Sequence, residues 1–258
     1  MRKTRKEEEE MTKQITEKDK EFLKSYDANQ YEHPSVTTDI LIFTVDIKGE
    51  LELLLIKRKH PPYQGSWAIP GGFVNMNESL EEGAKRELKE ETDIDGVHIE
   101  QLYTFGNVGR DPRTRVISVA YMALVPKNML TVKAGDDAAD ARWYKVTLEN
   151  GKPKFNEDIT LAFDHEEIVT VALDRLRGKL NYTTIAFNLL GDVNRFSIYE
   201  LQKVHEAILG KKLNAANFRR SFMLNFVNKG YVEETGEACT EYAHRASKYY
   251  RMVKEQNN

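Results

Sequence analysis

The chain has 258 residues, of which 40% are hydrophobic and 10% aromatic, so it can form a core in one large or two smaller domains. This composition excludes a chain that is disordered throughout, and a formal charge of −3 indicates no particular partner. The single cysteine, Cys239, excludes an internal disulfide framework and favours a reducing compartment.

The N-terminal residues 1–14 are almost all polar, a basic block followed by four glutamates, and predict a mobile tail. They contain no apolar segment typical of a signal peptide, and no run in the chain approaches the roughly 18 apolar residues of a membrane span. We therefore expect a cytoplasmic protein with no membrane partner. A short helix is predicted next, because Thr16 can cap it and Phe22, Leu23 and Tyr26 recur at helical spacing.

Strand-like and helical patterns alternate after this helix. The predicted strands cover residues 35–46, 51–59, 67–73, 97–108, 115–126 and 141–146. The predicted helices cover residues 79–91 and 158–180, the second ending near Gly178. This alternation predicts a mixed α/β domain over residues 15–180.

The pattern changes in the last third of the chain. A helix is predicted over residues 197–210, opened by a capping box of Ser197 and Glu200, and a second over residues 214–230. A strand, a turn and a second strand-like segment follow in residues 231–253. Two helices followed by a β-wing is the order of a winged helix-turn-helix.

Three glutamates stand close together on the helix predicted over residues 79–91. At about 100° per residue, Glu87, Glu90 and Glu91 fall within roughly one 100° sector of that helix. Ala84 shares the sector and Leu88 borders it, so the carboxylates lie beside the apolar stripe. Such a cluster repels itself and loses solvation, and a hard divalent cation such as Mg²⁺ removes both costs.

A glycine-rich turn precedes this helix. Gly71 and Gly72 allow the backbone to approach a ligand closely, and a helix N-terminus attracts phosphate, so the combination suggests metal-assisted chemistry on a phosphorylated substrate. The alternative is a solvated surface helix supported by ion pairs four residues apart. Those pairs are Glu81 with Lys85, Glu82 with Arg86, and Arg86 with Glu90.

The longer pattern decides between these interpretations. From Gly72 the chain reads GFVNMNESLEEGAKRELKEETDI. This stretch resembles the signature of the Nudix hydrolase family, G-x5-E-x7-R-E-U-x-E-E-x-G-U, in which U is a bulky aliphatic residue. Every defined position matches except the late glycine, which is Asp93 here, and we expect a modest local change with the site intact.

The resemblance implies a role for each residue of the signature. The implied ligands of Mg²⁺ or Mn²⁺ are Glu87, Glu90, Glu91 and the Gly72 carbonyl oxygen. One of the glutamates would help to deprotonate the attacking water, Arg86 would hold the glutamates in place, and Glu78 would stabilise the loop-helix-loop. The implied reaction is hydrolysis of a nucleoside diphosphate linked to another moiety, most readily ADP-ribose or a similar nucleotide sugar.

Further site candidates lie outside the signature. Candidates for contacting the substrate phosphates are Arg58, Arg110 and Arg113. The acids Asp137 and Asp140 are candidates for a further ligand or substrate contact, against the alternative of a solvated loop. We interpret His165 as a structural or capping residue.

Charge is distributed unevenly along the chain. From Arg195 to the end, eleven lysines and arginines face seven acids, a net charge of +4 that leaves −7 on residues 1–194. This asymmetry suits a polyanion-binding module over residues 181–258. The candidate DNA-binding residues are Lys211, Lys212, Asn217, Arg219 and Arg220. The alternative is a docking or dimerisation domain with a solvated basic face.

The fold expected from these patterns is a Nudix α/β/α sandwich with a mixed sheet, followed by a winged helix-turn-helix domain. That pairing resembles bacterial regulators of NAD and sugar metabolism whose Nudix domain binds ADP-ribose or a related ligand and controls DNA binding, and it implies a homodimer. Two hypotheses stay open: a metal-dependent pyrophosphohydrolase, and a transcription regulator that senses such a ligand.

Overall fold

The computed structural model describes residues 15–92, 95–129, 138–180, 182–239 and 247–253. The predicted tail over residues 1–14 lies outside them, as do Asp93 and Asp137. The chain divides into two compact units, Met1–Pro34 and Ser35–Asn258. No helix in the described part is both long and apolar enough to cross a membrane.

The first unit contains the predicted short helix. Helix α2 covers Glu17–Ser25 and begins with a capping box in which Thr16 and Asp19 exchange hydrogen bonds. A 3-10 helix, η1, follows at Ala28–Gln30. The side chains of Phe22, Leu23 and Tyr26 are all exposed.

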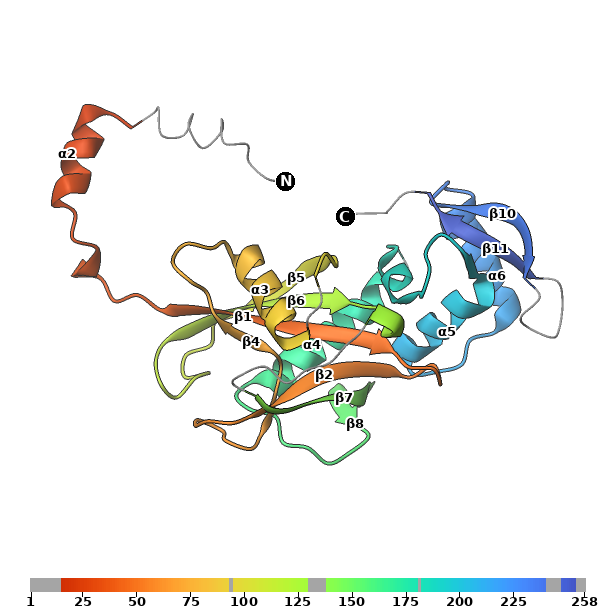
Figure 1. Cartoon of the computed structure of the whole chain (residues 1–258), viewed down its shortest axis with the longest axis horizontal. Coiled ribbons are helices and arrows are strands. Elements are labelled where there is room, and N and C mark those ends of the chain that lie inside the picture. The colour runs from red at the N-terminus through yellow and green to blue at the C-terminus, as the bar shows by residue number, and fades with distance from the viewer. Residues whose placement is uncertain (1–14, 93–94, 130–137, 181, 240–246, 254–258) are drawn as a thin grey trace. The chain divides into compact units, whose positions relative to one another are not determined.

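The second unit is built on a mixed sheet, shown in Figure 1. Its strands are β1 (Ser35–Val45), β2 (Leu51–Arg58), β3 (Trp67–Ala68), β4 (Gly71–Phe73), β5 (Ile99–Phe105), β6 (Val116–Leu124), β7 (Ala138–Glu149) and β8 (Lys152–Phe155). The order is β5-β6-β1-β2-β7-β8, with β3 paired to β2 and β4 to β1. The sheet is mixed because β1 and β6 run parallel while the other pairs are antiparallel.

One helix covers each face of the sheet. Alternate residues of β1 point to opposite sides, so Ile40 and Ile42 pack with one core cluster and Leu41 and Phe43 with another. The first cluster includes Leu88 of α3 (Leu80–Thr92), and the second includes the buried residues of α4 (His165–Lys179). The predicted α/β/α sandwich is therefore confirmed.

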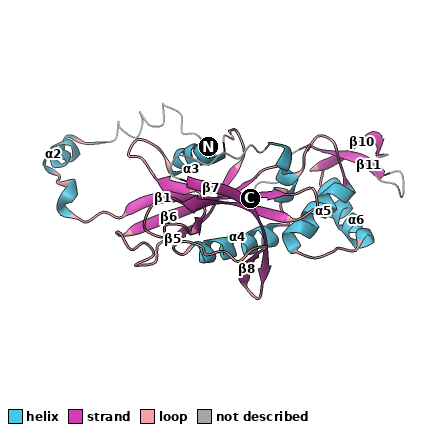
Figure 2. Cartoon of the chain, turned by 60° about the horizontal axis from the view of Figure 1, so that its bottom comes forward, coloured by secondary structure: helices cyan, strands magenta, loops and turns pink. Residues whose placement is uncertain are grey.

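The winged-helix prediction is also confirmed, and Figure 2 shows the two helices beside a small sheet. The elements are η3 (Ile185–Leu189), β9 (Phe196–Ser197), α5 (Ile198–Leu209), α6 (Ala215–Phe222), η4 (Met223–Val227), β10 (Val232–Cys239) and β11 (Ser247–Met252). The sheet order is β10-β11-β9. Helix α5 begins at the predicted capping box of Ser197 and Glu200 and ends at Gly210, whose φ of 66° suits glycine.

Two predicted helix ranges were wrong at one end. Residues 158–164 are not helical, because Trp67 pairs with this segment instead: its N–H donates to the Thr160 carbonyl at 2.9 Å, and Ala162 N–H donates to the Trp67 carbonyl at 2.8 Å. The predicted second helix of the winged domain remains α-helical only to Phe222 and continues as a π-helical turn.

The sandwich and the winged helix share a single apolar core. One cluster of buried side chains includes Leu176 of α4, Phe187 of η3, Leu201 of α5, Phe222 of α6 and Tyr250 of β11. The ring pairs in it are close, with Phe187 and Phe196 centroids 5.4 Å apart. The winged helix therefore packs on the sandwich through buried apolar contact.

Candidate functional site

Helix α3 carries the glutamates of the signature. It begins after Ser79, whose hydroxyl accepts the Glu82 N–H at 3.2 Å while the Glu82 carboxylate accepts the Ser79 N–H at 2.9 Å. Glu87 and Glu91 are each 8% exposed and lie beside the buried stripe, as predicted. Glu90 is exposed on the flank of the same helix.

Arg86 binds three carboxylates at once. Its guanidinium donates to Glu78 through Nε at 3.1 Å and Nη2 at 2.8 Å. Its Nη1 donates to Glu87 Oε1 at 2.7 Å and to Glu90 Oε2 at 3.1 Å. Glu78 also accepts the Asn75 N–H at 2.8 Å and so ties the loop before α3 to the helix. One guanidinium thus holds three carboxylates of the signature together, while the site roles that the family resemblance implies for Arg86 and Glu78 stay predictions.

The surroundings of Glu78 and Glu87 shift the pKa values of these two carboxyl groups in opposite directions. Hydrogen bonds from Arg86 and the Asn75 N–H lower the pKa of Glu78 to about 2. Burial raises the pKa of Glu87, and Arg86 only partly offsets that rise. Glu87 therefore holds its negative charge at a cost in desolvation, and a cation beside it would lower that cost.

Gly72 lies against the Glu87 carboxylate. A Cβ atom on residue 72 would fall 2.3 Å from Glu87 Oε1, so only glycine leaves this space open. The carboxylate oxygens of α3 and the backbone of Gly72 are the hard donors that Mg²⁺ prefers. These residues therefore fit a divalent cation in chemistry.

The placement of the described side chains does not by itself form a closed cation site. Among the described residues, no three acid, histidine or cysteine side chains are gathered closely enough to hold a metal ion. Arg86 Nη1 lies between the carboxylates of Glu87 and Glu90, at 2.7 and 3.1 Å from their oxygens. The metal roles of Glu87, Glu90, Glu91 and Gly72 stay predictions.

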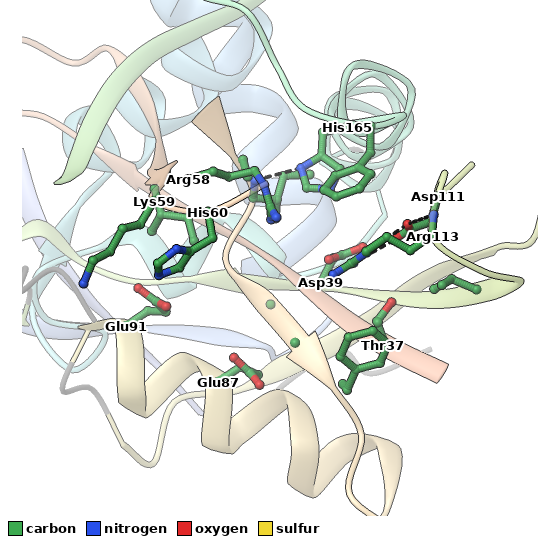
Figure 3. Close-up of a pocket in the computed structure, with 18 of the residues that line it drawn as sticks. Thr37, Asp39, Arg58, Lys59, His60, Glu87, Glu91, Asp111, Arg113 and His165 are labelled. Atoms are coloured by element: carbon green, nitrogen blue, oxygen red, sulfur yellow. Dashed lines mark hydrogen bonds and ion pairs between the residues drawn. The ribbon is translucent and has the colours of Figure 1, made fainter. Parts of the chain in front are cut away.

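These residues open onto a cavity of about 740 Å³, shown in Figure 3. Glu87 and Glu91 lie on one side of it and His165 on the other. The predicted residues that line it are Arg58, Gly72, Arg86, Glu87, Glu90, Glu91, Arg110 and Arg113. The structure thus brings together candidates from four separate parts of the sequence.

Two predicted acids do not line the cavity. Glu78 lies behind Arg86 and acts through it. Asp140 is on β7 and pairs with Arg142 at 2.6 Å.

The three predicted arginines differ in how strongly the protein engages them. Arg58 donates from Nε to the Pro62 carbonyl at 2.8 Å, and its guanidinium carbon is 4.9 Å from the Phe163 ring centroid. Burial lowers the pKa of Arg58. Arg113 is 44% exposed and forms a bidentate pair with Asp111. Both present guanidinium groups to the cavity and remain candidates for contact with phosphate.

Arg110 is engaged by protein carboxylates. Its side chain is 6% exposed, and it donates to both oxygens of Asp164 at 2.8 and 2.7 Å. Asp39 lies 3.7 Å away on the other side and accepts a hydrogen bond from the Ser118 hydroxyl. Arg110 therefore forms part of a buried ion-pair network in the cavity wall.

His165 has the structural role that we expected. Its Nδ1 accepts the Ile69 N–H at 2.9 Å, which links the first turn of α4 to the segment between β3 and β4 that leads into Gly72. Burial lowers the pKa of His165, so the ring is neutral at pH 7. Because Nδ1 accepts, the proton of the neutral ring is on Nε2.

Sequence reasoning missed several residues of the cavity wall. They are Thr37, Asp39, Lys59, His60, Asp111 and Phe163. A usable signal existed for Asp39, because it is the only charged residue in the apolar strand β1. Thr37 also lies in β1, where its small polar side chain gave no such signal, and the other four stand in loops, where no periodic pattern marks them.

The turn between α5 and α6 is organised by a buried carboxylate. Glu206 is 6% exposed and accepts hydrogen bonds from the Leu213 N–H at 3.0 Å and the Gln202 amide at 2.9 Å. Lys212 donates to it at 3.1 Å while its side chain stays 82% exposed. Asn214 then caps α6 by accepting the Asn217 N–H at 3.0 Å.

Helix α6 exposes a polar face opposite its phenylalanines. Phe218, Phe222 and Phe226 recur every four residues, and Phe222 and Phe226 are buried while Phe218 is half-buried. The predicted DNA-binding residues Lys211, Lys212, Asn217, Arg219 and Arg220 are all exposed. The helix is therefore free on the side that carries most of the positive charge.

Comparison with known proteins agrees with both halves of this architecture. Residues 35–181 match the NUDIX domain, and residues 186–252 match the NrtR DNA-binding winged helix domain. The ADPR responsive transcriptional repressor NtrR of Acinetobacter baylyi is 36% identical over 84% of this chain and 82% of its own length. The ADP-ribose pyrophosphatase of Methanocaldococcus jannaschii is 39% identical over 58% of this chain and 81% of its own length.

A solved structure shows the same two-domain arrangement. The crystal structure of Shewanella oneidensis NrtR complexed with a 27mer DNA superposes with a TM-score of 0.68 at 30% identity, covering 86% of this chain and 99% of that one. The chain therefore belongs to the Nudix family and joins its NUDIX domain to an NrtR-type DNA-binding winged helix domain.

Proposed function

We propose that this protein is a transcription regulator whose affinity for DNA responds to ADP-ribose. The observation that carries the proposal is the presence, in one packed unit, of a cavity lined by cationic groups and an exposed basic recognition helix. The match to a repressor over most of both chains supports it.

The DNA contact is assigned to α6 and the turn before it. Lys211 and Lys212 would contact phosphates, while Arg219 and Arg220 carry donors that suit guanine edges or the backbone. A homodimer would present two such helices to a two-fold symmetric site, and light scattering after gel filtration tests that state. Binding to DNA would place the protein inside the cell.

The ligand contact is assigned to the cavity beside α3. A volume of about 740 Å³ suits a small molecule such as a nucleotide sugar. Arg58 and Arg113 supply positive charge for a diphosphate, and Phe163 adds an aromatic surface between them. The names of both relatives refer to ADP-ribose, and a diphosphate of this kind suits the cationic groups of the cavity. We therefore infer that ADP-ribose is the ligand.

A gel-shift or anisotropy titration with the DNA upstream of the protein's own gene tests this function. We expect specific binding whose affinity changes at least about fivefold with ADP-ribose, and not with AMP. Equal binding to that DNA and to an unrelated duplex of the same length would contradict the proposal.

A second candidate function is hydrolysis of ADP-ribose, which the complete set of signature glutamates favours. Bound Mg²⁺ would polarise a phosphoryl oxygen and activate the attacking water. In this chain Glu87, Glu90 and Glu91 would hold the cation, Arg86 would orient the carboxylates, and Arg58 and Arg113 would hold the diphosphate. Water would add to one phosphorus as the bridging P–O bond breaks, giving AMP and ribose 5-phosphate.

A panel of nucleotide sugars tests this second function. We expect Mg²⁺-dependent turnover of ADP-ribose that the Glu90→Gln variant loses, with Glu81→Gln on the same helix as the control. If no compound in the panel is hydrolysed, the hydrolase function is wrong and the ligand-responsive regulator is the function that stands.

A further inference from the structure

The first residues of α4 combine three unusual features at the cavity wall. Phe163 has a φ of 51°, a left-handed conformation that is strained for a bulky side chain. Asp164 is the N-cap residue of α4, yet its side chain makes no capping hydrogen bond to the described backbone. His165 is buried and bonded to Ile69. Strain and an unused cap at one helix start indicate a segment held in place by other contacts.

The contact that holds Asp164 is its ion pair with Arg110. Both carboxylate oxygens accept from the Arg110 guanidinium, and neither accepts a capping hydrogen bond from the first turn of α4. Aspartate is among the preferred N-cap residues, so Asp164 is able to cap α4 once Arg110 no longer holds it. Arg110 lines the cavity, and an anionic ligand there competes with Asp164 for the guanidinium.

The far end of α4 is fastened to the winged helix. Arg177 donates from Nε to the Ile208 carbonyl at the end of α5, at 3.1 Å. Its other nitrogens donate to the Leu148 carbonyl at 3.4 Å and the Thr147 hydroxyl at 3.3 Å. Arg177 thus joins α4, the sheet and α5 at one point, and Figure 2 shows α4 reaching α5 there.

The fastening point directly precedes the DNA-contacting turn. Gly210 ends α5 beside Arg177, and a Cβ atom on it would fall 2.8 Å from the Thr147 hydroxyl and 3.6 Å from Arg177 Nη2. Asn214, four residues later, caps α6. The 15 residues of α4 span about 22 Å, so one rigid helix connects the cavity to this turn.

We infer that α4 transmits ligand occupancy to the recognition helix: an anionic ligand that takes Arg110 releases Asp164 to cap α4, and Arg177 passes the resulting shift of the helix to α5. This inference rests on the proposed regulatory function. It identifies Asp164 and Arg177 as coupling residues that touch neither the ligand cavity nor the DNA-contacting side chains.

The decisive variant is Arg177→Met, because it removes all three hydrogen bonds and keeps an unbranched side chain. The quantity to measure is the ratio of the DNA dissociation constants with and without saturating ADP-ribose, for the full chain. In wild type, we expect ADP-ribose to change the DNA dissociation constant by at least about fivefold. In Arg177→Met, we expect the change to be less than about twofold. ADP-ribose affinity of the variant without DNA, by calorimetry, should stay within about twofold of wild type.

Matched controls lie on the same helix. Arg175 and Asp174 are exposed on α4, so Arg175→Met and Asp174→Asn should keep the wild-type ratio. Asp164→Asn keeps a side chain that can cap and loses the ion pair. Its DNA affinity without ligand should therefore move toward the value that wild type shows with ADP-ribose.

The outcomes separate the inference from the function on which it rests. If wild type binds DNA without any response to ADP-ribose, the proposed function is wrong and the inference falls with it. If wild type responds and Arg177→Met keeps the full ratio, the inference alone is wrong. If Arg177→Met does not melt cooperatively, Arg177→Lys and Thr147→Val test the inference instead, because each removes only part of the contact. If neither of these variants reduces the ratio, the inference is wrong.

Discussion

Glu87 and Gly72 lie so close together that the space a Cβ atom on residue 72 would need is already taken, with Glu87 Oε1 only 2.3 Å away. The obstructing atom is the tip of a side chain, so Gly72→Ala can be accommodated by turning Glu87 aside. We expect a change in unfolding free energy below about 1 kcal/mol, and at least about tenfold weaker Mg²⁺ binding by calorimetry with nucleotide present.

The matched substitution for this test is Gly106→Ala. Its nearest neighbour, Arg115 Nη2, would be 3.9 Å from the new Cβ atom, which is ordinary contact. If Gly72→Ala binds Mg²⁺ as tightly as Gly106→Ala does, Mg²⁺ binding does not require Glu87 to keep its present position.

Glu206→Gln should weaken the helix-turn-helix and remove part of its acid sensitivity. Burial raises the pKa of Glu206, but hydrogen bonds from the Leu213 N–H, Gln202 and two lysines lower it further, from 4.5 to about 2. The ionised carboxylate therefore stabilises the fold above pH 4.5, and this stabilisation is lost as the pH falls toward 2.

We expect Glu206→Gln to cost roughly 2 kcal/mol at pH 7, with the difference from wild type shrinking at pH 3. Denaturant melts at both pH values measure it. Glu237→Gln, on the exposed strand β10, should change little. A difference that does not depend on pH would mean that the charge of Glu206 contributes nothing.

His165→Gln should make the protein less sensitive to mild acid. Burial holds the pKa of His165 below its ordinary 6.5, so the unfolded chain takes up a proton that the folded chain resists. Stability from this group is complete above pH 6.5 and falls as the pH drops below it. Glutamine can still accept the Ile69 N–H without titrating in this range.

Between pH 7.5 and 5.5, wild type should therefore lose more unfolding free energy than His165→Gln. His98→Gln serves as the control, because His98 is exposed. Equal losses in wild type and His165→Gln would show that the ring accepts a proton without leaving its site.

Arg219→Ala and Arg220→Ala should weaken DNA binding without affecting the cavity. Each variant that loses a phosphate contact should reduce the slope of log affinity against log salt concentration by about 1. A loss confined to one operator sequence would instead assign that arginine to a base edge. Lys154→Ala, on β8 and paired with Glu149, should leave both affinity and slope unchanged.

Local signals in the sequence were sufficient to predict the bounds of the helices whose ends have side-chain caps. Ser197 with Glu200 and Gly210 define α5 within the chain segment itself, and helical periodicity alone placed Glu87 and Glu91 beside the core. The helix predicted over residues 158–180 shows the limit. Its first seven residues have a helical pattern, but Trp67 binds their backbone from across the fold.

The cavity wall depends on contacts between distant parts of the chain. Ile69 and His165 are 96 residues apart in sequence, and Arg110 and Asp164 are 54 apart. No periodicity or spacing rule connects such pairs, because the fold brings them together only once the sheet has formed. The family signature therefore located the cavity, and only the three-dimensional contacts showed which protein groups hold each arginine of its wall: Pro62 for Arg58, Asp164 for Arg110 and Asp111 for Arg113.

The common apolar cluster under both domains also restricts how such a chain can be assembled from parts. A winged helix that shares Leu176, Phe187 and Phe222 with the sandwich cannot be exchanged for another by recombination at the linker, since each half would be left with an exposed apolar surface. The side chains tolerated in one half are therefore constrained by those that the other half packs against them.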